Sequence, residues 1–250
     1  IKNKIEEISV FLKELQDIEI KTGVTTGHAQ AFIIDKKKKE ELNDNNIIKP
    51  LLRGREIKKF HISFSQKYII FTRRGIDISK HPSVKSYLEQ FKSELTPKTS
   101  TNKIGRKPGP YKWFEIQDNT AYYKEFEKNK IVWPLTADKW GFALDQNKFY
   151  LTSGGFFLVS NTISLKFLLS VFNSKLLKYY FKFIGVMTAG GAYTLKAATI
   201  HKFPIVKSNY TKIFEILVDY ITFLKSQSFS DPHDKLMDSF FEQVLDGLVY

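Results

Sequence analysis

The sequence predicts an α+β fold, in which helices flank a mixed, twisted β-sheet. Short apolar runs bounded by glycine, proline or asparagine recur between residues 18 and 160, a pattern typical of strands joined by irregular loops. Segments with an apolar residue at every third or fourth position lie before residue 16 and after residue 164, which is typical of amphipathic helices. Hydrophobic residues make up 42% of the 250 residues, enough for a sizeable core.

The chain is strongly basic, with 39 Lys and Arg against 26 Asp and Glu and a formal net charge of +13. This excess favours a polyanionic partner, nucleic acid first and an anionic membrane second, although solubility alone also explains such a charge. The absence of cysteine excludes disulfides and cysteine–zinc sites, and we expect a cytoplasmic protein. No apolar run approaches the roughly 18–20 residues of a membrane span, so we expect no membrane partner.

The first twenty residues predict a connector helix. Ile5, Ile8, Leu12 and Leu15 follow one another at spacings of three, four and three, which predicts an amphipathic helix of about four turns. Connection or packing is the expected role of residues 1–20. Because the chain begins without Met and within this pattern, we also expect it to be a fragment of a longer protein.

Residues 47–75 combine apolar side chains with cations. The apolar run IIKPLL (47–52) is followed by RGREIKKF (53–60), and residues 67–72 predict a strand that ends at Arg73, Arg74 and Gly75. Such an element buries one edge and offers guanidinium groups from the other. Arginine is the side chain best shaped for phosphate and for the guanine edge, so this stretch is a candidate for nucleic-acid binding.

Residues 96–112, TPKTSTNKIGRKPGPYK, form the least regular segment. It contains three prolines and two glycines, and every charged residue in it is basic. Such a segment builds no core of its own. Two interpretations stay open: a loop that follows a phosphate backbone and orders on contact, or a disordered surface loop.

Residues 130–159 predict further strands. Residues 130–134 form an apolar run that ends in proline, and residues 156–159 form another that follows Gly154 and Gly155. Residues 138–145 and 149–151 flank a short turn at 146–148, which predicts a hairpin.

Helical periodicity dominates the last third of the chain. Apolar residues from Leu165 to Ile184 predict one core helix with lysines along another face. The Gly- and Thr-rich residues 185–196 are interpreted as a loop that either approaches DNA closely or simply leaves the helix. Two more helices follow, and Asp231 and Pro232 predict the N-cap and first position of the second.

In this order, the motifs resemble those of the TaqI-like C-terminal specificity domain, the DNA target-recognition part of type IIG restriction–modification enzymes and related adenine methyltransferases. IIKPLLRGREIKKF (47–60) is similar to the family signature, and LLSVFNSKLLKYYFK (168–182) is the strongest single match. HKFPI (201–205) resembles the closing motif. The resemblance implies a connector helix at 1–20, a DNA target-recognition domain at 21–206 and a C-terminal helical segment at 207–250.

The resemblance also implies a function. A sequence-specific DNA-binding domain of a type IIG-like restriction–modification enzyme or N6-adenine DNA methyltransferase supplies specificity, while other domains of the parent chain methylate or cleave. The implied partners are double-stranded DNA and those methyltransferase and nuclease domains. S-adenosyl-methionine and Mg²⁺ are expected for the parent protein. No cofactor is expected for this fragment, which we expect not to be an enzyme itself.

The chemistry of the residues favours a non-catalytic fragment. No Pro-Pro dipeptide is present, although an adenine methyltransferase needs an Asn/Asp-Pro-Pro-Tyr/Phe element to hold the flipped base. Asp44, Glu56 and Lys58 are the one nuclease-like set, since two carboxylates and a lysine can form a Mg²⁺ site. The pattern Glu-x-Lys is also common by chance. The five histidines are scattered without metal-ligand spacing.

A rival hypothesis is a helical, basic protein-interaction module that docks on a methyltransferase partner without binding DNA itself. The amphipathic first helix and the two C-terminal helices favour it, because their apolar faces suit a protein partner.

Eleven basic residues are the predicted DNA contacts. Those that end a strand or lie in the irregular loop are assigned to bases or their surroundings: Arg73, Arg74, Arg106 and Lys107. The phosphate contacts are assigned to Lys98, Lys103, Lys112, Lys139 and Lys196. Arg53 and Arg55 are further candidates, with bracing of the fold through acidic partners as the alternative role.

Overall fold

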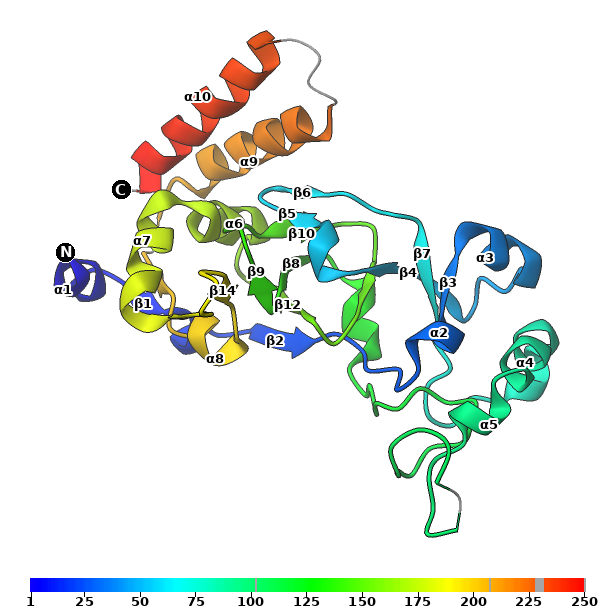
Figure 1. Cartoon of the computed structure of the whole chain (residues 1–250). Coiled ribbons are helices and arrows are strands. Elements are labelled where there is room, and N and C mark those ends of the chain that lie inside the picture. The colour runs from blue at the N-terminus through cyan, green and yellow to red at the C-terminus, as the bar shows by residue number, and fades with distance from the viewer. Residues whose placement is uncertain (102, 207, 228–231, 250) are drawn as a thin grey trace.

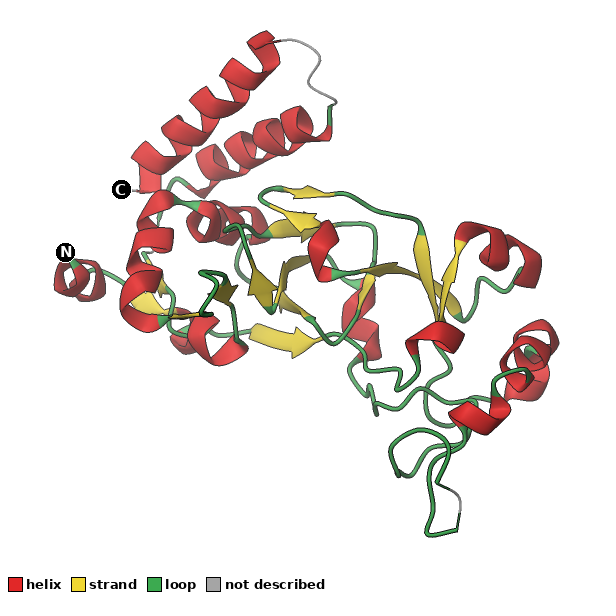
Figure 2. Cartoon of the chain, viewed as in Figure 1, coloured by secondary structure: helices red, strands yellow, loops and turns green. Residues whose placement is uncertain are grey.

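Two four-stranded sheets lie at the centre of the computed structural model, which describes residues 1–101, 103–206, 208–227 and 232–249 (Figure 1). Strands occupy the middle of the molecule and helices gather toward its two ends (Figure 2). This arrangement confirms the predicted α+β class. It differs from the prediction in one respect, because the described strands form two principal sheets and three small ones instead of a single mixed sheet.

The first principal sheet is antiparallel, in the order β10-β8-β12-β2. Side chains on its two central strands alternate between two hydrophobic cores: Val132 and Phe157 belong to one, while Ile131, Trp133 and Leu158 belong to the other. The sheet therefore separates the two cores. Its strands are β2 (Ile18–Thr22), β8 (Lys130–Pro134), β10 (Ala143–Asp145) and β12 (Gly155–Ser160).

The second principal sheet, in the order β11-β4-β7-β3, is mixed, because β11 runs parallel to β4 while the other neighbours are antiparallel. Its strands are β3 (Ile33–Asp35), β4 (Ile48–Leu52), β7 (Lys67–Ile70) and β11 (Tyr150–Leu151). The small sheets pair β1 (Val10–Phe11) with β15 (Pro204–Ile205), β5 (Ile57–Lys58) with β6 (His61–Ile62), and β14 (Tyr193–Thr194) with both β13 (Val186–Met187) and β9 (Thr136–Ala137).

Helices cover both cores. On one side lie α2 (Ala29–Phe32), α3 (Lys36–Leu42), α4 (Pro82–Glu89) and α5 (Lys92–Leu95), and on the other α1 (Lys2–Glu7), α6 (Leu165–Asn173), α7 (Lys175–Ile184), α8 (Ala197–Ile200), α9 (Thr211–Ser226) and α10 (Pro232–Val249) (Figure 1). Short 3-10 turns are η1 (Leu12–Glu14), η2 (Gly54–Glu56), η3 (Ile78–Lys80) and η4 (Tyr123–Glu127). No helix in the described ranges combines the length and the apolar character needed to cross a membrane.

The hairpin predicted around residues 146–148 is wrong. β10 pairs with β8 in the first principal sheet and β11 pairs with β4 in the second, so the two flanking strands separate. The carboxylate of Asp145 fixes the turn between them, because it accepts the backbone N–H groups of Asn147 and Phe149 at 2.7 and 2.9 Å. The chain thus crosses from the first principal sheet to the second at the place where the sequence pattern predicts a β-hairpin.

Two predicted helices differ in the structure: one is shorter and the other is divided in two. The first stops at Glu7, because the chain continues into β1, which pairs with β15. The core helix predicted from 165 to 184 is two helices, since the hydroxyl of Ser174 caps α7 by accepting the backbone N–H of Leu177 at 3.1 Å. The two C-terminal helices are confirmed, whereas the predicted N-cap Asp231 lies outside the described residues.

Candidate nucleic-acid interface

The signature segment folds into the tight turn η2 followed by the short hairpin β5–β6. Arg53 donates two hydrogen bonds to the carboxylate of the buried Glu56, from Nε at 3.0 Å and from Nη2 at 2.8 Å. The hydroxyl of Ser65 donates to the same carboxylate. Glu56 therefore balances the charge of Arg53, and the structure gives Arg53 the bracing role that was one of its two predicted alternatives.

Beyond this turn lies a groove of about 870 Å³. Residues 54–61 form one wall, and residues 134–140, which include β9, form the other. Gly54 lets the two walls meet, because a Cβ at this position would stand only 2.9 Å from the Cβ of Pro134. We refer to this feature as the basic groove, because the residues that line it include five cations, Arg55, Lys58, Lys59, Lys139 and Lys225, against one acid, Asp138.

Three of these cations have no acidic partner among the described residues. The side chains of Arg55, Lys58 and Lys139 are exposed, and within the described part of the chain they form no ion pair. Lys59 and Lys225 differ, since both contact the carboxylate of Glu242. Unpaired cations along a concave surface create a positive potential that attracts polyanions.

His61 lies among these cations on the first wall. Partial burial, and then the positive charge of Lys225, lower the pKa of His61 below its ordinary value. The imidazole is therefore neutral at physiological pH. It offers a hydrogen-bond donor and an acceptor to a bound molecule rather than a further charge.

Lys196 emerges next to the second wall. β14 pairs with β9, and the backbone N–H of Leu195 donates to the carbonyl of Leu135 at 2.7 Å. The exposed Lys196 follows directly. The structure thus places Lys196 next to the segment that carries Lys139, although Lys139 lines the basic groove and Lys196 does not.

The loop at 96–112 is a second basic region, at the lower end of Figure 1 and away from β5 and β9. Its base is fixed by a β-bridge between Pro97 and Arg106 and by a hydrogen bond from the N–H of Lys98 to the carbonyl of Arg106 at 2.9 Å. The two ends of the loop are thus held together, and contact of the loop with a phosphate backbone stays a prediction. The exposed lysines of the region are Lys98, Lys103, Lys107 and Lys112.

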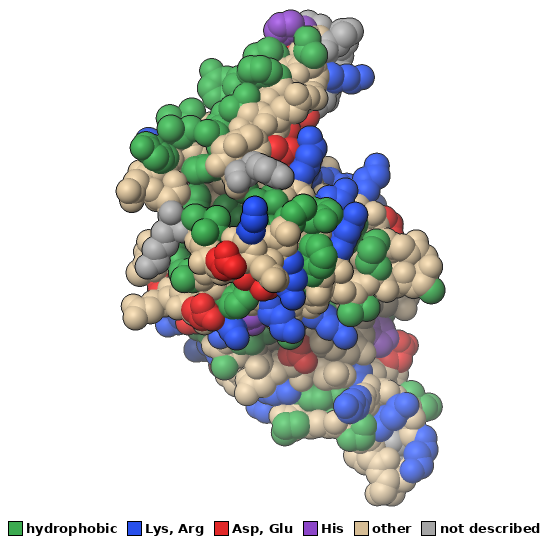
Figure 3. All heavy atoms as spheres, turned by 90° about the vertical axis from the view of Figure 1, so that its left-hand side faces the viewer, with side chains coloured by type: hydrophobic (Ala, Val, Ile, Leu, Met, Phe, Trp, Pro, Cys, Tyr) green, Lys and Arg blue, Asp and Glu red, His purple; other side chains and the backbone are tan. Residues whose placement is uncertain are grey.

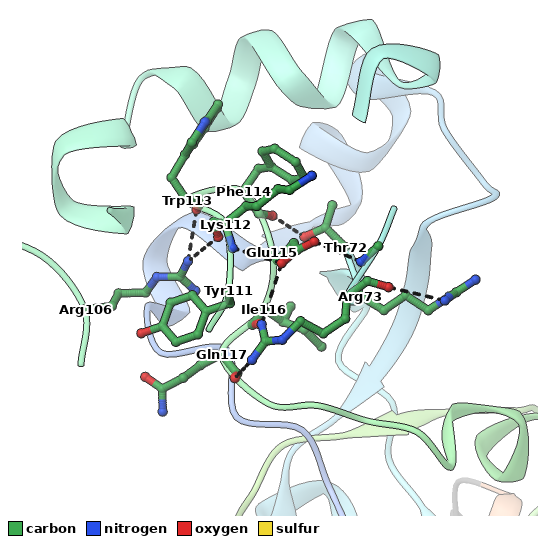
Figure 4. Close-up of polar contacts among 12 residues, drawn as sticks. Thr72, Arg73, Arg106, Tyr111, Lys112, Trp113, Phe114, Glu115, Ile116 and Gln117 are labelled. Carbon is green, nitrogen blue, oxygen red and sulfur yellow. Dashed lines mark hydrogen bonds and ion pairs between the residues drawn. The ribbon is translucent and has the colours of Figure 1, made fainter. Parts of the chain in front are cut away.

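Arg106 holds this loop to the rest of the protein. Its side chain is only 3% exposed and donates to the carbonyls of Leu95 at 2.7 Å and Thr26 at 2.9 Å. It also donates to the carbonyls of Trp113 at 3.0 Å and Lys112 at 3.3 Å (Figure 4). Burial lowers its pKa to about 10, so the guanidinium stays charged at neutral pH. The expectation that Arg106 contacts a base is therefore corrected, because its donors face backbone carbonyls rather than solvent.

Arg73 and Arg74 lie near Arg106 and Tyr111, but their side chains make different contacts. Arg74 donates to the carbonyls of Ile116 and Gln117 at 2.8 and 2.7 Å, and its guanidinium lies 4.9 Å from the ring centre of Tyr111. Arg73 is exposed, and its side chain points away from Arg106 and Tyr111 in Figure 4. Arg74 is thus held by two backbone carbonyls, whereas Arg73 is exposed, with its guanidinium 4.8 Å from the ring centre of Tyr123.

The nuclease-like set is not brought together. Asp44 precedes β4 and pairs with His81 at 2.6 Å, whereas Glu56 follows β4 and is held by Arg53. Over the described ranges, no group of three or more His, Asp or Glu side chains could hold a metal ion. The arrangement therefore offers no support for a Mg²⁺-dependent nuclease.

Three cations of the basic groove lie outside the predicted set: Lys58, Lys59 and Lys225. The first two carry a local signal, because they interrupt the apolar residues Ile57 and Phe60 in the signature itself. Lys225 carries none, since its place in the groove depends on how α9 packs against the distant hairpin β5–β6.

Basic side chains are unevenly spread over the surface. On the face shown in Figure 3, Lys and Arg side chains form a band across the middle and gather again at the lower end. Hydrophobic side chains are conspicuous at the top of the same view, where the C-terminal helices lie.

Solved structures share this fold. The type IIL restriction–modification enzyme MmeI, solved in complex with DNA, matches at a TM-score of 0.61 and 13% identity, over 97% of this chain and 34% of its own. The type IIG restriction endonuclease BpuSI matches at a TM-score of 0.55 and 12% identity, over 99% of this chain and 32% of its own. This chain therefore spans about a third of either enzyme.

The family follows from the sequence. No curated protein matches the chain. The family model of the TaqI-like C-terminal specificity domain, however, matches residues 49–205, a range that contains the signature turn and both walls of the basic groove. Because the match covers well over half of the chain, and in agreement with the resemblance seen in its motifs, this protein belongs to the TaqI-like C-terminal specificity domain family.

Proposed function

We propose that this chain is the DNA target-recognition domain of a restriction–modification protein related to the type IIG enzymes. It binds double-stranded DNA sequence-specifically, while other domains of a longer cytoplasmic protein methylate or cleave. The observation that carries the proposal is the basic groove beside the family signature, where Arg55, Lys58 and Lys139 are exposed and form no ion pair with the residues that the structure describes. S-adenosyl-methionine and Mg²⁺ belong, in this proposal, to the other domains.

Lysines of the basic groove bind phosphates. Lys58 stands on one wall and Lys139 on the other, with Lys196 beside the second, so a DNA backbone lying in the groove meets positive charge on both sides. Each neutralised phosphate releases counterions, so the logarithm of the binding constant falls by about 0.9 per phosphate for each tenfold rise in salt. These contacts set affinity and position but carry no sequence information.

Arg55 reads a base edge. Its guanidinium presents N–H groups in a rigid fork that matches O6 and N7 of guanine, and such a pair discriminates by roughly 1–3 kcal/mol. The guanidinium of Arg53 is hydrogen-bonded to Glu56, whereas the guanidinium of Arg55 has no protein partner within the described residues. The two arginines of the signature therefore divide the structural role and the binding role between them.

The second basic region extends the contact along the duplex. Lys98, Lys103, Lys107 and Lys112 are exposed on a loop whose base is fixed, and Arg73 is exposed beside it. Because the two ends of the loop are held together, less conformational entropy is lost when these side chains bind phosphate. We assign the lysines to the backbone and keep Arg73 as a candidate for a second base contact.

A fluorescence-anisotropy titration of the 250-residue chain with a labelled random-sequence duplex tests the proposal. Contact with four phosphates gives a slope of about −3.6, which predicts roughly a hundredfold weaker binding at about 200 mM salt than at about 50 mM. A subsequent selection from a random duplex library then yields the target site. Absence of binding at the lower salt concentration contradicts the proposal.

One observation favours a second function, docking on a protein partner. Ile213, Ile216, Tyr220 and Phe223 are exposed along one side of α9 at spacings of three, four and three. Such a stripe suits packing against another helix, as expected of a module that binds a methyltransferase. A salt-insensitive complex with a methyltransferase, formed by a chain without DNA affinity, supports this alternative.

A further inference from the structure

A carboxylate from the C-terminal helix bridges two lysines of the basic groove. Oε2 of Glu242, on α10, lies 2.5 Å from Nζ of Lys59, and its Oε1 lies 2.8 Å from Nζ of Lys225 on α9. Lys225 also contacts Asp238 at 2.7 Å. One carboxylate therefore contacts cations that come from two distant parts of the chain, and Asp238 supplies a second negative charge to Lys225.

This bridge stands at the wall of the groove and not inside a core. Both lysines line the groove, and the side chains of Lys59 and Glu242 remain 26% and 22% exposed. Burial raises the pKa of Glu242, but hydrogen bonds from Lys225 and Lys59 and the positive charges of these two lysines together hold it below its ordinary value. The carboxylate is therefore ionised at neutral pH, and solvent and ligands have access to the pair that it binds.

The same geometry suits a phosphate. Two ammonium groups that converge on the oxygens of one carboxylate are equally placed to donate to two oxygens of a phosphodiester. The neighbouring Arg55, Lys58 and Lys139 have no such internal acid, so Lys59 and Lys225 are the exceptions among the groove cations of the described chain.

We infer that Lys59 and Lys225 form a phosphate subsite of the groove, and that Glu242 occupies it until DNA displaces the carboxylate. The inference rests on the proposed function, because it presupposes that the basic groove binds DNA. Glu242 then acts as an internal competitor, which lowers affinity for any duplex without changing which base pairs are read. Asp238 keeps α10 attached to Lys225 when Glu242 is displaced.

The test compares Glu242→Gln with the wild-type chain in anisotropy titrations with a random-sequence duplex from about 50 to 200 mM salt. Freeing the subsite for one phosphate steepens the slope by about 0.9, which corresponds to roughly tenfold tighter binding at about 50 mM salt. Asp219→Asn is the matched control. Asp219, on α9, pairs with Lys166 outside the groove, so this variant removes one negative charge, as Glu242→Gln does, and leaves the slope unchanged.

Two further variants make the outcome decisive. The double variant Glu242→Gln/Lys59→Met loses the gain in affinity if that gain comes from the subsite. Weaker or unchanged binding by Glu242→Gln, in a chain whose thermal unfolding remains cooperative, overturns the inference and makes Glu242 a structural tie. If Arg55→Ala/Lys139→Ala leaves wild-type affinity unchanged, the groove itself is not the DNA interface and the proposed function fails at this site, which distinguishes the two failures.

Discussion

Lys130 and Asp145 form an ion pair in which both side chains are fully buried, with Nζ 2.5 Å from Oδ2. They face each other at paired positions of β8 and β10. Burial opposes the charge of each group, because it lowers the pKa of Lys130 and raises that of Asp145. Further hydrogen bonds compensate: Lys130 donates to the carbonyl of Phe126 at 2.6 Å, and Asp145 accepts two backbone N–H groups. The pair thus fixes the point at which the chain leaves the first sheet for the second.

Removal of one member of this pair should be costly. Lys130→Met leaves a buried carboxylate without its counter-ion, and we expect the free energy of unfolding in urea to fall by about 3–5 kcal/mol. Lys130→Met/Asp145→Asn removes both charges and keeps an acceptor in the turn, so it should recover at least half of this loss. Strictly additive effects of the two substitutions would show that the residues do not interact.

Arg106 is expected to hold the second basic region through its fork of donors. Arg106→Lys keeps the charge but leaves several buried carbonyls unpaired, so we expect a loss of about 3 kcal/mol and faster tryptic cleavage within residues 96–112. Arg73→Lys is the control, because Arg73 is exposed and should tolerate the change within about 0.5 kcal/mol. Equal proteolysis of the two variants contradicts the assignment.

Two glycines that line the basic groove should respond differently to the same substitution. Gly54→Ala places a Cβ 2.9 Å from Pro134, so we expect overpacking to cost about 1–3 kcal/mol and the walls to shift. A Cβ at Gly154 meets no atom within 4 Å, so Gly154→Ala should be nearly neutral. Thermal unfolding of the two variants measures the difference, and a cost at Gly154 that equals the cost at Gly54 argues against the described wall.

The contact between Glu242 and its two lysines should make stability depend on pH. The pKa of Glu242 is lower in the folded chain, so its contribution is present above the unfolded pKa of about 4.3 and disappears as pH falls through the folded pKa. The difference in unfolding free energy between wild type and Glu242→Gln should therefore be largest near pH 7 and shrink in acid. A difference that stays constant down to pH 3 contradicts the ion-pair account.

The sequence predicted what local patterns determine. The family signature, the buried strand at 130–134 and the two C-terminal helices follow from spacing and motif, and the structure confirms them. The prediction of a hairpin at 146–148 is wrong because two strand-like runs around a short turn do not reveal that Asp145 is the buried partner of Lys130.

Tertiary contacts decide the remaining assignments. A lysine- and proline-rich loop predicts an exposed arginine at position 106, and only the fold shows that four carbonyls surround it. The bridge from Lys59 to Glu242 joins residues 183 positions apart, so no window of sequence contains it. The exposure of Arg55 beside a braced Arg53 likewise depends on the partner that each side chain finds.

Specificity should separate from affinity within the basic groove. Arg55→Ala is expected to relax the preference at one base pair by roughly 1–3 kcal/mol, because it removes a bidentate base contact. Lys139→Ala should weaken all sequences alike and reduce the salt slope by about 0.9, as expected for a phosphate contact. Selection from a random duplex library with each variant distinguishes the two. Uniform weakening by Arg55→Ala would make Arg55 a phosphate contact instead.

The central claim is that the basic groove is the DNA interface, and one comparison tests it most directly. Arg55→Ala/Lys139→Ala is titrated against the same random-sequence duplex as Lys36→Ala/Lys85→Ala, which removes the same charge from α3 and α4, where each lysine pairs with an acid four residues later. We predict at least about tenfold weaker binding and a shallower salt slope for the groove variant, and less than about a twofold change for the control. Equal losses in both variants would show that net charge alone binds DNA and would contradict the account.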